Sequence, residues 1–108
     1  MDDKNFILIQ GWMVKHLNID SKELFLFAII YGFSQDKETS FKGSRKYISE
    51  ILKCSVNHVS DLLNRLLNKK LIIKNSKIIN NVQFNSYTVN FDEIEKLTKS
   101  NINKKMKI

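Results

Sequence analysis

Two consecutive segments in the middle of the chain carry apolar residues at helical spacing. The apolar positions are Tyr47, Ile48, Ile51 and Leu52 in the first segment and Val59, Leu62, Leu63, Leu66 and Leu67 in the second. Each segment opens on a serine, Ser44 or Ser55, whose hydroxyl can accept a backbone N–H at the start of a helix. The pattern therefore predicts two amphipathic helices, over residues 44–53 and 55–70, joined by a tight turn at Cys54.

The segment before these helices is apolar on nearly all sides. Residues 24–31 form an almost unbroken apolar run, and Ser21 precedes it as a candidate N-cap. A helix over residues 22–33 without a polar face belongs at the centre of the fold. Nearer the N-terminus, residues 6–9 predict a strand or an extended arm, and residues 12–17 predict a short helix.

A β-hairpin is predicted after the second amphipathic helix. Apolar residues flank Asn80 and Asn81 on both sides, and asparagine tolerates the positive φ that a two-residue hairpin turn requires. Between the central helix and the helix pair, residues 34–42 predict a loop that ends in a short strand near Phe41. A final helix is predicted from Asp92, because acidic residues in a first turn suit the helix dipole.

The apolar pattern changes phase within the second strand of this hairpin. Val82 and Phe84 share one face of the strand, whereas Tyr87 and Val89 fall on the other, because side chains alternate along a strand. We expect a β-bulge at residues 85–86 to bring both pairs to the same face.

Helix, turn, helix and hairpin in this order are typical of a winged helix-turn-helix. We therefore predict an α+β fold, mostly helical, with a C-terminal β-hairpin wing and with residues 55–70 as the recognition helix. A chain of 108 residues has room for one such domain. We expect residues 1–98 to form this domain with its N-terminal arm, and residues 99–108 to form a basic flexible tail.

The net charge of +7 is confined to one part of the chain. Residues 42–77 contain nine Lys or Arg and two acids, whereas the bases and acids of the remaining chain cancel. Positive charge gathered in one region is typical of a surface that binds a polyanion. A general richness in lysine would not keep acids out of the same window. Double-stranded DNA is therefore the predicted partner.

The candidate DNA contacts fall into two classes. Side chains of the recognition helix that can hydrogen-bond to base edges are Asn57, His58, Ser60, Asp61 and Asn64. Candidates for phosphate contacts at helix starts, in the turn and in the wing are Ser44, Arg45, Lys46, Lys53, Ser55, Arg65, Lys69, Lys74 and Lys77. Asparagine pairs with adenine and aspartate accepts from cytosine, whereas phosphate contacts position a protein without reading sequence. Because the recognition helix lacks an early Arg or Lys, we expect the phosphate contacts to supply most of the affinity.

Several short motifs resemble a known group of proteins. They are residues 9–13 (Ile-Gln-Gly-Trp-Met), 31–36 (Tyr-Gly-Phe-Ser-Gln-Asp), 41–44 (Phe-Lys-Gly-Ser), 80–82 (Asn-Asn-Val) and 87–90 (Tyr-Thr-Val-Asn). Over residues 6–91 the chain resembles the N-terminal domains of replication initiators and DnaD-like replisome organisers of phages and plasmids from low-GC bacteria. The resemblance implies a winged helix that recognises origin DNA or organises a replisome, with replisome proteins as further partners. Such domains usually precede a C-terminal region, so the chain is either one domain of a longer protein or a minimal relative.

Two lysines stand where such motifs often have glycine. Lys53 follows the first helix of the pair and Lys70 follows the recognition helix. A positive φ at these positions costs a residue other than glycine on the order of 1 kcal/mol. We therefore expect either distorted turns or lysines that face DNA phosphates.

Metal and catalytic sites have few candidate residues in the sequence. Cys54 is the only cysteine, and His16 and His58 are the only histidines, which are too few ligands for a typical zinc site. The sequence has no glycine-rich phosphate loop and no paired-carboxylate motif, so we expect no enzyme activity and no cofactor. A lone cysteine, the lack of an apolar run of about 18 residues and the lack of a signal peptide favour a cytoplasmic location without membrane contact.

Two alternative functions remain open at the level of sequence. The winged helix can serve protein–protein interaction or oligomerisation in a replisome, with Ile7, Ile9 and Trp12 of the N-terminal arm building a homodimer. A transcriptional repressor on the same fold would differ only in the DNA site that it binds. Duplex binding that weakens as salt rises would separate both DNA-binding functions from the interaction module.

Overall fold

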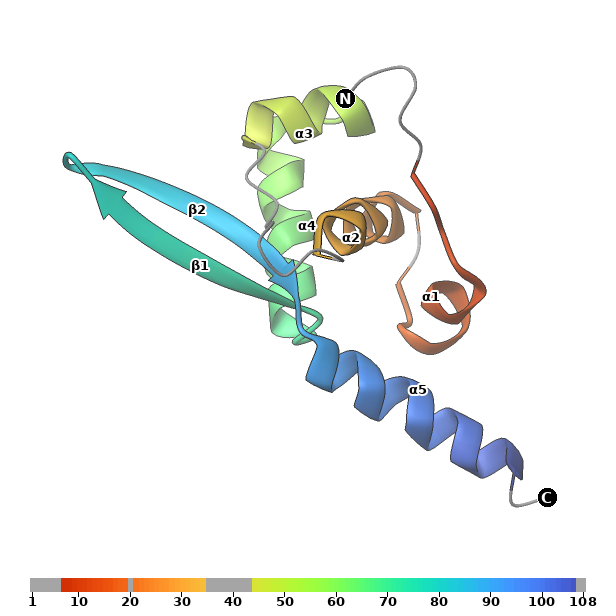
Figure 1. Ribbon diagram of the computed structural model, residues 1–108. Coiled ribbons are helices and arrows are strands. Elements are labelled where there is room, and N and C mark those ends of the chain that lie inside the picture. The colour runs from red at the N-terminus through yellow and green to blue at the C-terminus, as the bar shows by residue number, and fades with distance from the viewer. Residues whose placement is uncertain (1–6, 20, 35–43, 107–108) are drawn as a thin grey trace.

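The computed structural model describes residues 7–19, 21–34 and 44–106, with side chains up to residue 99. These ranges contain five helices and one two-stranded antiparallel sheet (Figure 1). The helices are α1 (Gly11–His16), α2 (Ser21–Ser34), α3 (Arg45–Leu52), α4 (Val56–Asn68) and α5 (Phe91–Met106), and the strands are β1 (Ile72–Ile79) and β2 (Val82–Val89). The order confirms the predicted helix-turn-helix followed by a hairpin wing.

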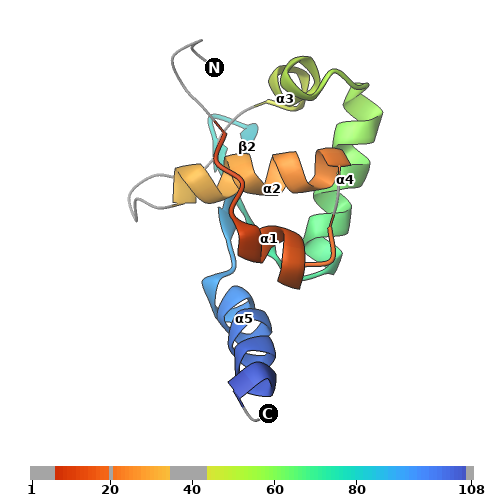
Figure 2. The same ribbon diagram turned by 90° about the vertical axis from the view of Figure 1, so that its right-hand side faces the viewer.

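Helix α2 lies at the centre of the fold, as its apolar composition predicts. The side chains of Leu26, Phe27 and Ile30 are completely buried, and the helix contacts α1, α3, α4 and β2. Figure 2 shows α2 running between α3 and α1, with α4 beside its N-terminal end. Because neighbouring elements cover most of its surface, α2 needs no polar face.

Serine caps begin both α3 and α4, and a left-handed lysine forms the turn between the two helices. The Oγ atoms of Ser44 and Ser55 each accept a backbone N–H three residues further on, at 3.1 Å. Lys53 has a φ of 54°, and its N–H and that of Cys54 both donate to the carbonyl of Ser49. The predicted caps are confirmed, and the turn adopts the left-handed backbone in spite of its lysine.

The C-terminal end of α4 is closed in a similar way. Lys70 has a φ of 62°, and its N–H donates to the carbonyl of Leu67 at 3.0 Å. The N–H of Leu71 donates to the carbonyl of Leu66, also at 3.0 Å. This pair of hydrogen bonds is the Schellman arrangement, which ends a helix through a left-handed residue. Since Leu66 and Leu71 are buried, core packing holds Lys70 in its unfavourable conformation.

Strands β1 and β2 form a regular hairpin. Their register runs in consecutive pairs from Ile72 opposite Val89 to Ile79 opposite Val82. The two asparagines between the strands have φ values of 51° and 66°, which is the conformation that a two-residue hairpin turn requires. The predicted asparagine turn is therefore confirmed.

The predicted bulge at residues 85–86 is wrong, because the two halves of β2 use different faces. Tyr87 and Val89 are buried against the core, whereas Val82 and Phe84 are exposed on the opposite face. The core ends beneath the base of the hairpin, so the distal half of the strand has no buried face that a bulge would help it reach. The phase shift in the sequence corresponds to a change of face in an unbroken strand.

Some element boundaries differ from those expected. Helix α2 begins at Ser21, one residue before the predicted start. Helix α5 begins at Phe91 and continues past residue 98, although the division of the chain at that residue stays a prediction. Residues 7–10 form neither helix nor strand, which favours the extended arm over a strand. The strand expected near Phe41 lies outside the described residues.

A buried serine joins α2 to the base of the wing. The Oγ of Ser34 accepts the N–H of Val89 at 3.0 Å and donates to the carbonyl of Ile30 at 2.8 Å. Ser34 and Val89 are both buried, so water cannot replace the serine as the partner of this amide. The bond joins residues 55 positions apart and fixes where the hairpin leaves the core.

Ser34→Ala is expected to lower the free energy of unfolding by about 1–3 kcal/mol, because the buried N–H of Val89 loses its acceptor. Ser60→Ala is the matched control, since the hydroxyl of the half-buried Ser60 makes a longer hydrogen bond, 3.3 Å to the carbonyl of Val56, that is exposed to solvent. Urea titrations followed by circular dichroism measure both variants against the wild type. Equal stability of the two variants would contradict the structural role of Ser34.

Candidate nucleic-acid interface

One long side of α4 is exposed to solvent. The buried residues of the helix are Val59, Leu62, Leu63 and Leu66. Asn57, Asp61 and Asn64 are exposed and lie on the opposite side, since residues three and four apart share one face of a helix. Figure 2 shows α4 along the outer edge of the molecule. If α4 entered the major groove of DNA, these three polar side chains would therefore be the ones that face the base edges.

His58 and Ser60 lie on the flanks of this exposed side. Both residues are half-buried. His58 and Arg65 line a groove of about 420 Å³ together with residues at the start of α2, among them Lys22. On the other flank, the Ser60 hydroxyl donates to the carbonyl of Val56 and keeps its acceptor lone pairs. The predicted base-reading residues are thus divided between the exposed side of α4 and its two flanks.

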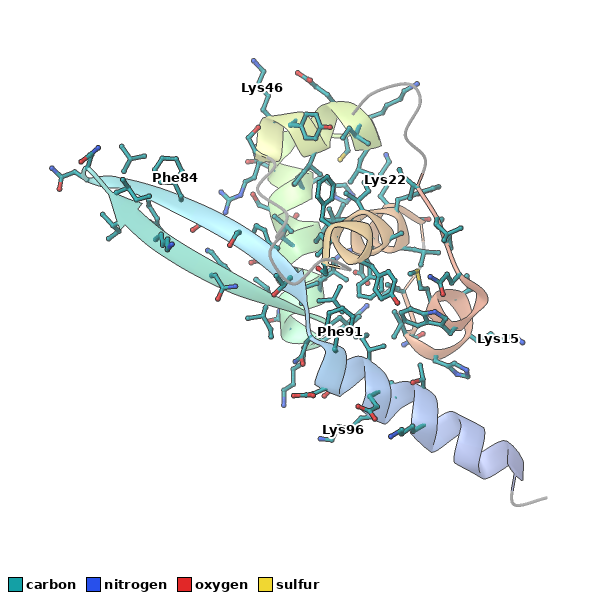
Figure 3. All side chains as sticks on the ribbon, viewed as in Figure 1. Lys15, Lys22, Lys46, Phe84, Phe91 and Lys96 are labelled. Carbon is teal, nitrogen blue, oxygen red and sulfur yellow. The ribbon has the colours of Figure 1, made fainter. Side chains whose placement is uncertain are left out.

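Exposed basic side chains stand on the elements that adjoin α4. Arg45 and Lys46 lie in the first turn of α3, Lys53 in the turn before α4, and Lys74 and Lys77 in β1, and all five are exposed. In Figure 3 the side chain of Lys46 extends away from α3 into solvent. Apart from Lys69, discussed below, the predicted phosphate-contacting bases are accessible.

The two wing lysines belong to opposite faces of the hairpin. Lys74 is paired with Tyr87, on the face that is buried at the base, whereas Lys77 is paired with Phe84 on the other face. Directly opposed residues of an antiparallel pair share a face, and neighbours along a strand alternate. A DNA backbone that runs along one face of the wing would therefore meet only one of these lysines.

Lys22 is a basic residue of this region that sequence reasoning missed. Its Nζ donates to the carbonyl of Lys53 at 3.5 Å, and it lines the same groove as His58 and Arg65. Lys22 and Lys53 are separated by 31 positions, so no local motif connects them. Only the packing of α2 against α4 brings this lysine beside the helix-turn-helix.

Lys69 takes part in an ion pair within the protein. Its Nζ lies 2.6 Å from Oε2 of Glu23 and 3.4 Å from the carbonyl oxygen of Asn18. The side chain of Glu23 is 7% exposed and that of Lys69 is 41% exposed, so the buried carboxylate relies on this lysine for its charge partner. Since Glu23 balances its charge, Lys69 has less to offer a phosphate than the other predicted bases.

The two predicted serine contacts are helix caps. Ser44 and Ser55 each accept an N–H of the helix that follows, and both side chains are exposed. Their hydroxyl protons stay available to donate to an oxygen. A phosphate beside either serine would also lie at the positive end of a helix dipole.

The residues of the predicted dimer arm pack against their own chain. The ring of Trp12 lies edge-on to Phe27 and Tyr31, with centroid distances of 6.2 and 5.2 Å. Ile7 and Ile9 are half-buried and pack against the same core. Part of the apolar surface that the sequence assigned to a second copy is therefore used within the chain, and the dimer stays a prediction.

The described ranges offer no cluster of metal ligands. Among those residues no group of three or more His, Cys, Asp and Glu side chains could hold a metal ion, and Cys54 is a half-buried free thiol.

None of the helices described has the length and apolar character that crossing a membrane requires. On α5, a hydrogen bond from Lys99 lowers the pKa of the Glu95 carboxyl.

Two solved structures share the fold of this chain. A crystal structure of the S. aureus MepR–DNA complex has a TM-score of 0.58 and 19% sequence identity, over 88% of this chain and 73% of that chain. A structure described as the N-terminal domain of a DNA binding protein has a TM-score of 0.56 and 19% identity, over 91% of this chain and 87% of that chain. No protein-family model and no curated protein matches the sequence. The structural likeness identifies the fold as a winged helix.

Lys69→Ala is expected to lower the free energy of unfolding by about 1–3 kcal/mol, because the buried carboxylate of Glu23 loses its charge partner. Lys99→Ala is the matched control, since its ion pair with Glu95 lies on the exposed surface of α5 and should contribute less than about 0.5 kcal/mol. Chemical denaturation at neutral pH measures both variants. If both variants changed the free energy of unfolding by the same small amount, Lys69 would have no structural role and would again be a candidate for phosphate contact.

Proposed function

We propose that this protein is a double-stranded DNA-binding winged-helix domain. The observation that carries the proposal is the group of exposed bases on α3, the turn and β1, next to a helix whose outer side is polar and exposed. In helix-turn-helix proteins the second helix lies in the major groove and the neighbouring elements contact the backbone. Likeness to a structure that contains DNA supports this reading. The proposed role is binding, without catalysis and without a cofactor.

Asn57, Asp61 and Asn64 form the proposed base-reading side of α4. Asparagine makes paired hydrogen bonds with adenine, and aspartate accepts from the amino group of cytosine but repels phosphate. His58 and Ser60, on the flanks, would reach neighbouring base edges. Because its centre carries no Arg or Lys, this side of the helix contributes sequence selectivity more than affinity.

Phosphate contacts are proposed to supply most of the affinity. The proposed contacts are Ser44, Arg45, Lys46, Lys53, Ser55, Arg65 and Lys74, with Lys22 added from the structure. Lys69 is left out because Glu23 neutralises it, and Lys77 because it lies on the other face of the wing from Lys74. Each phosphate that the protein neutralises releases counterions, so affinity should fall steeply as salt rises.

The biological role depends on which DNA site is bound. A role in phage or plasmid replication is proposed from the sequence resemblance alone. A transcriptional repressor with the same fold is the first alternative, and a replisome interaction module is the second. The cytoplasmic location expected from the single cysteine fits all of these roles.

Arg45→Ala/Lys74→Ala is expected to weaken duplex binding about tenfold or more and to reduce the slope of log affinity against log salt by about 2. Each substitution removes one exposed charge that faces a phosphate in the proposed complex, and neither side chain is part of the core. Fluorescence anisotropy of a labelled random-sequence duplex over a series of salt concentrations measures both quantities.

Lys15→Ala/Lys96→Ala is the matched control for this experiment. It removes the same total charge from exposed lysines on α1 and α5 (Figure 3), so the duplex affinity should change by no more than about twofold. Negligible duplex binding by the wild type even at low salt would contradict the proposal and favour the interaction module. Equal losses in the two double variants would remove the specific role of Arg45 and Lys74.

Lys53→Gly is expected to change folding and binding in opposite directions. Glycine relieves the positive φ of 54°, so the free energy of unfolding should rise by up to about 1 kcal/mol, while the lost charge weakens duplex binding. Lys70→Gly is the matched control, because it relieves a φ of 62° outside the proposed contacts. Denaturation and anisotropy measure the two effects. If Lys53→Gly loses no more affinity than Lys70→Gly, Lys53 does not contact phosphate.

A further inference from the structure

The distal half of the wing has an exposed apolar face. The outer wing face consists of Lys77, Ile79, Val82 and Phe84, which the register places side by side as Lys77–Phe84 and Ile79–Val82 pairs. The three apolar residues are 52–54% exposed, and Figure 3 shows Phe84 near the tip of the hairpin, away from the helices. The solvated face of an antiparallel sheet is normally polar, so this face has the composition of a covered surface.

The opposite face of the same segment is mainly polar and internally hydrogen-bonded. The Ser76 hydroxyl donates to Oδ1 of Asn85 at 2.9 Å, and Nε2 of Gln83 donates to the same oxygen at 3.2 Å. This is the face that Tyr87 buries at the base of the hairpin, and Ile78 is its exposed apolar exception. The polar face thus continues the side of the wing that meets the core, and the apolar face is turned away from it.

We propose that the outer wing face binds a segment of a partner protein that is apolar and carries acidic residues. Strands β1 and β2 and their turn contain two lysines and no Asp or Glu, so every charge that the wing offers is positive. Lys77 lies directly opposite Phe84 on this face. A segment with apolar side chains against Val82 and Phe84 and an acid beside Lys77 complements both the apolar surface and the charge.

A second copy of this chain fits the outer wing face less well. A two-fold contact places the same patch on both sides, so it would bring two Lys77 side chains into one apolar interface with no wing acid between them. Duplex DNA also fits less well, because its phosphates can pair with Lys77 but leave Ile79, Val82 and Phe84 against a charged and hydrated backbone. Both of these occupants are outcomes of the test below.

Selection of random linear peptides on the full chain tests the proposal. Peptides are selected on the wild type and depleted on Val82→Thr/Phe84→Thr, in which β-branched residues preserve the strand propensity. The surviving peptides are expected to combine apolar residues with Asp or Glu. Their affinity for the double variant should be lower by at least about tenfold. Lys77→Glu should lower the affinity for the same peptides. Exchanging the acidic residues of the peptides for lysine should restore binding to that variant.

Ile78→Thr is the matched control, because Ile78 is 76% exposed on the other face of the same hairpin. This variant should bind the selected peptides with the affinity of the wild type. Circular dichroism checks that each variant is folded, and Lys77→Glu keeps the test valid if the double variant is not. The proposal is overturned if no selected peptide loses affinity when Val82 and Phe84 are replaced. It is also overturned if sedimentation shows that the wild type is a dimer and the double variant a monomer. A loss of duplex affinity in the double variant would assign the face to DNA instead. Peptide binding without duplex binding would overturn only the DNA-binding function.

Discussion

The arrangement of this protein depends on burying α2, a helix without a polar face. Full burial of one large apolar side chain contributes about 1.5–3 kcal/mol, and α2 obtains this from contacts with α1, α3, α4 and β2. Two polar residues at its ends position the functional elements. Glu23 near its start binds Lys69 at the end of α4, and Ser34 at its end binds Val89 in the wing. The recognition helix and the hairpin are therefore both placed by the same central helix.

The parts of the fold that could be predicted from sequence are those that depend on neighbouring residues. The caps Ser44 and Ser55 act within one turn, and a two-residue asparagine turn acts within one hairpin. The sequence led to a wrong prediction, or to none, where the deciding contact joins residues that are far apart in the sequence. Lys69 has its partner 46 positions away, and Lys22 reaches the turn only through the packing of α2. The bulge was wrong because strand periodicity shows which residues share a face, but not how far the core extends beneath the strand.

The two left-handed lysines are an informative departure from the sequence pattern. Lys53 at the end of α3 and Lys70 just after α4 keep positive φ values, where glycine would be the least strained residue, at a cost of about 1 kcal/mol each. Hydrogen bonds and buried leucines hold these conformations in place, so the strain does not distort the turns. What lysine adds at these positions is charge. Lys53 is among the proposed phosphate contacts, so a function of its side chain accounts for the strained lysine there, whereas nothing in the structure explains the lysine at position 70.

The wing shows how one hairpin can carry two surfaces of different chemistry. Its base is fixed by Val89, and the hairpin extends from the core with Lys74 on one face and, nearer the tip, Lys77 on the other. Since neighbouring residues of a strand alternate, a change of apolar phase along β2 leaves a polar face continuous with the core side and an apolar face turned away from it. A ligand on the polar face and a protein segment on the apolar face would not compete for the same side chains. If both proposals hold, the hairpin would contact DNA through one face and a partner protein through the other.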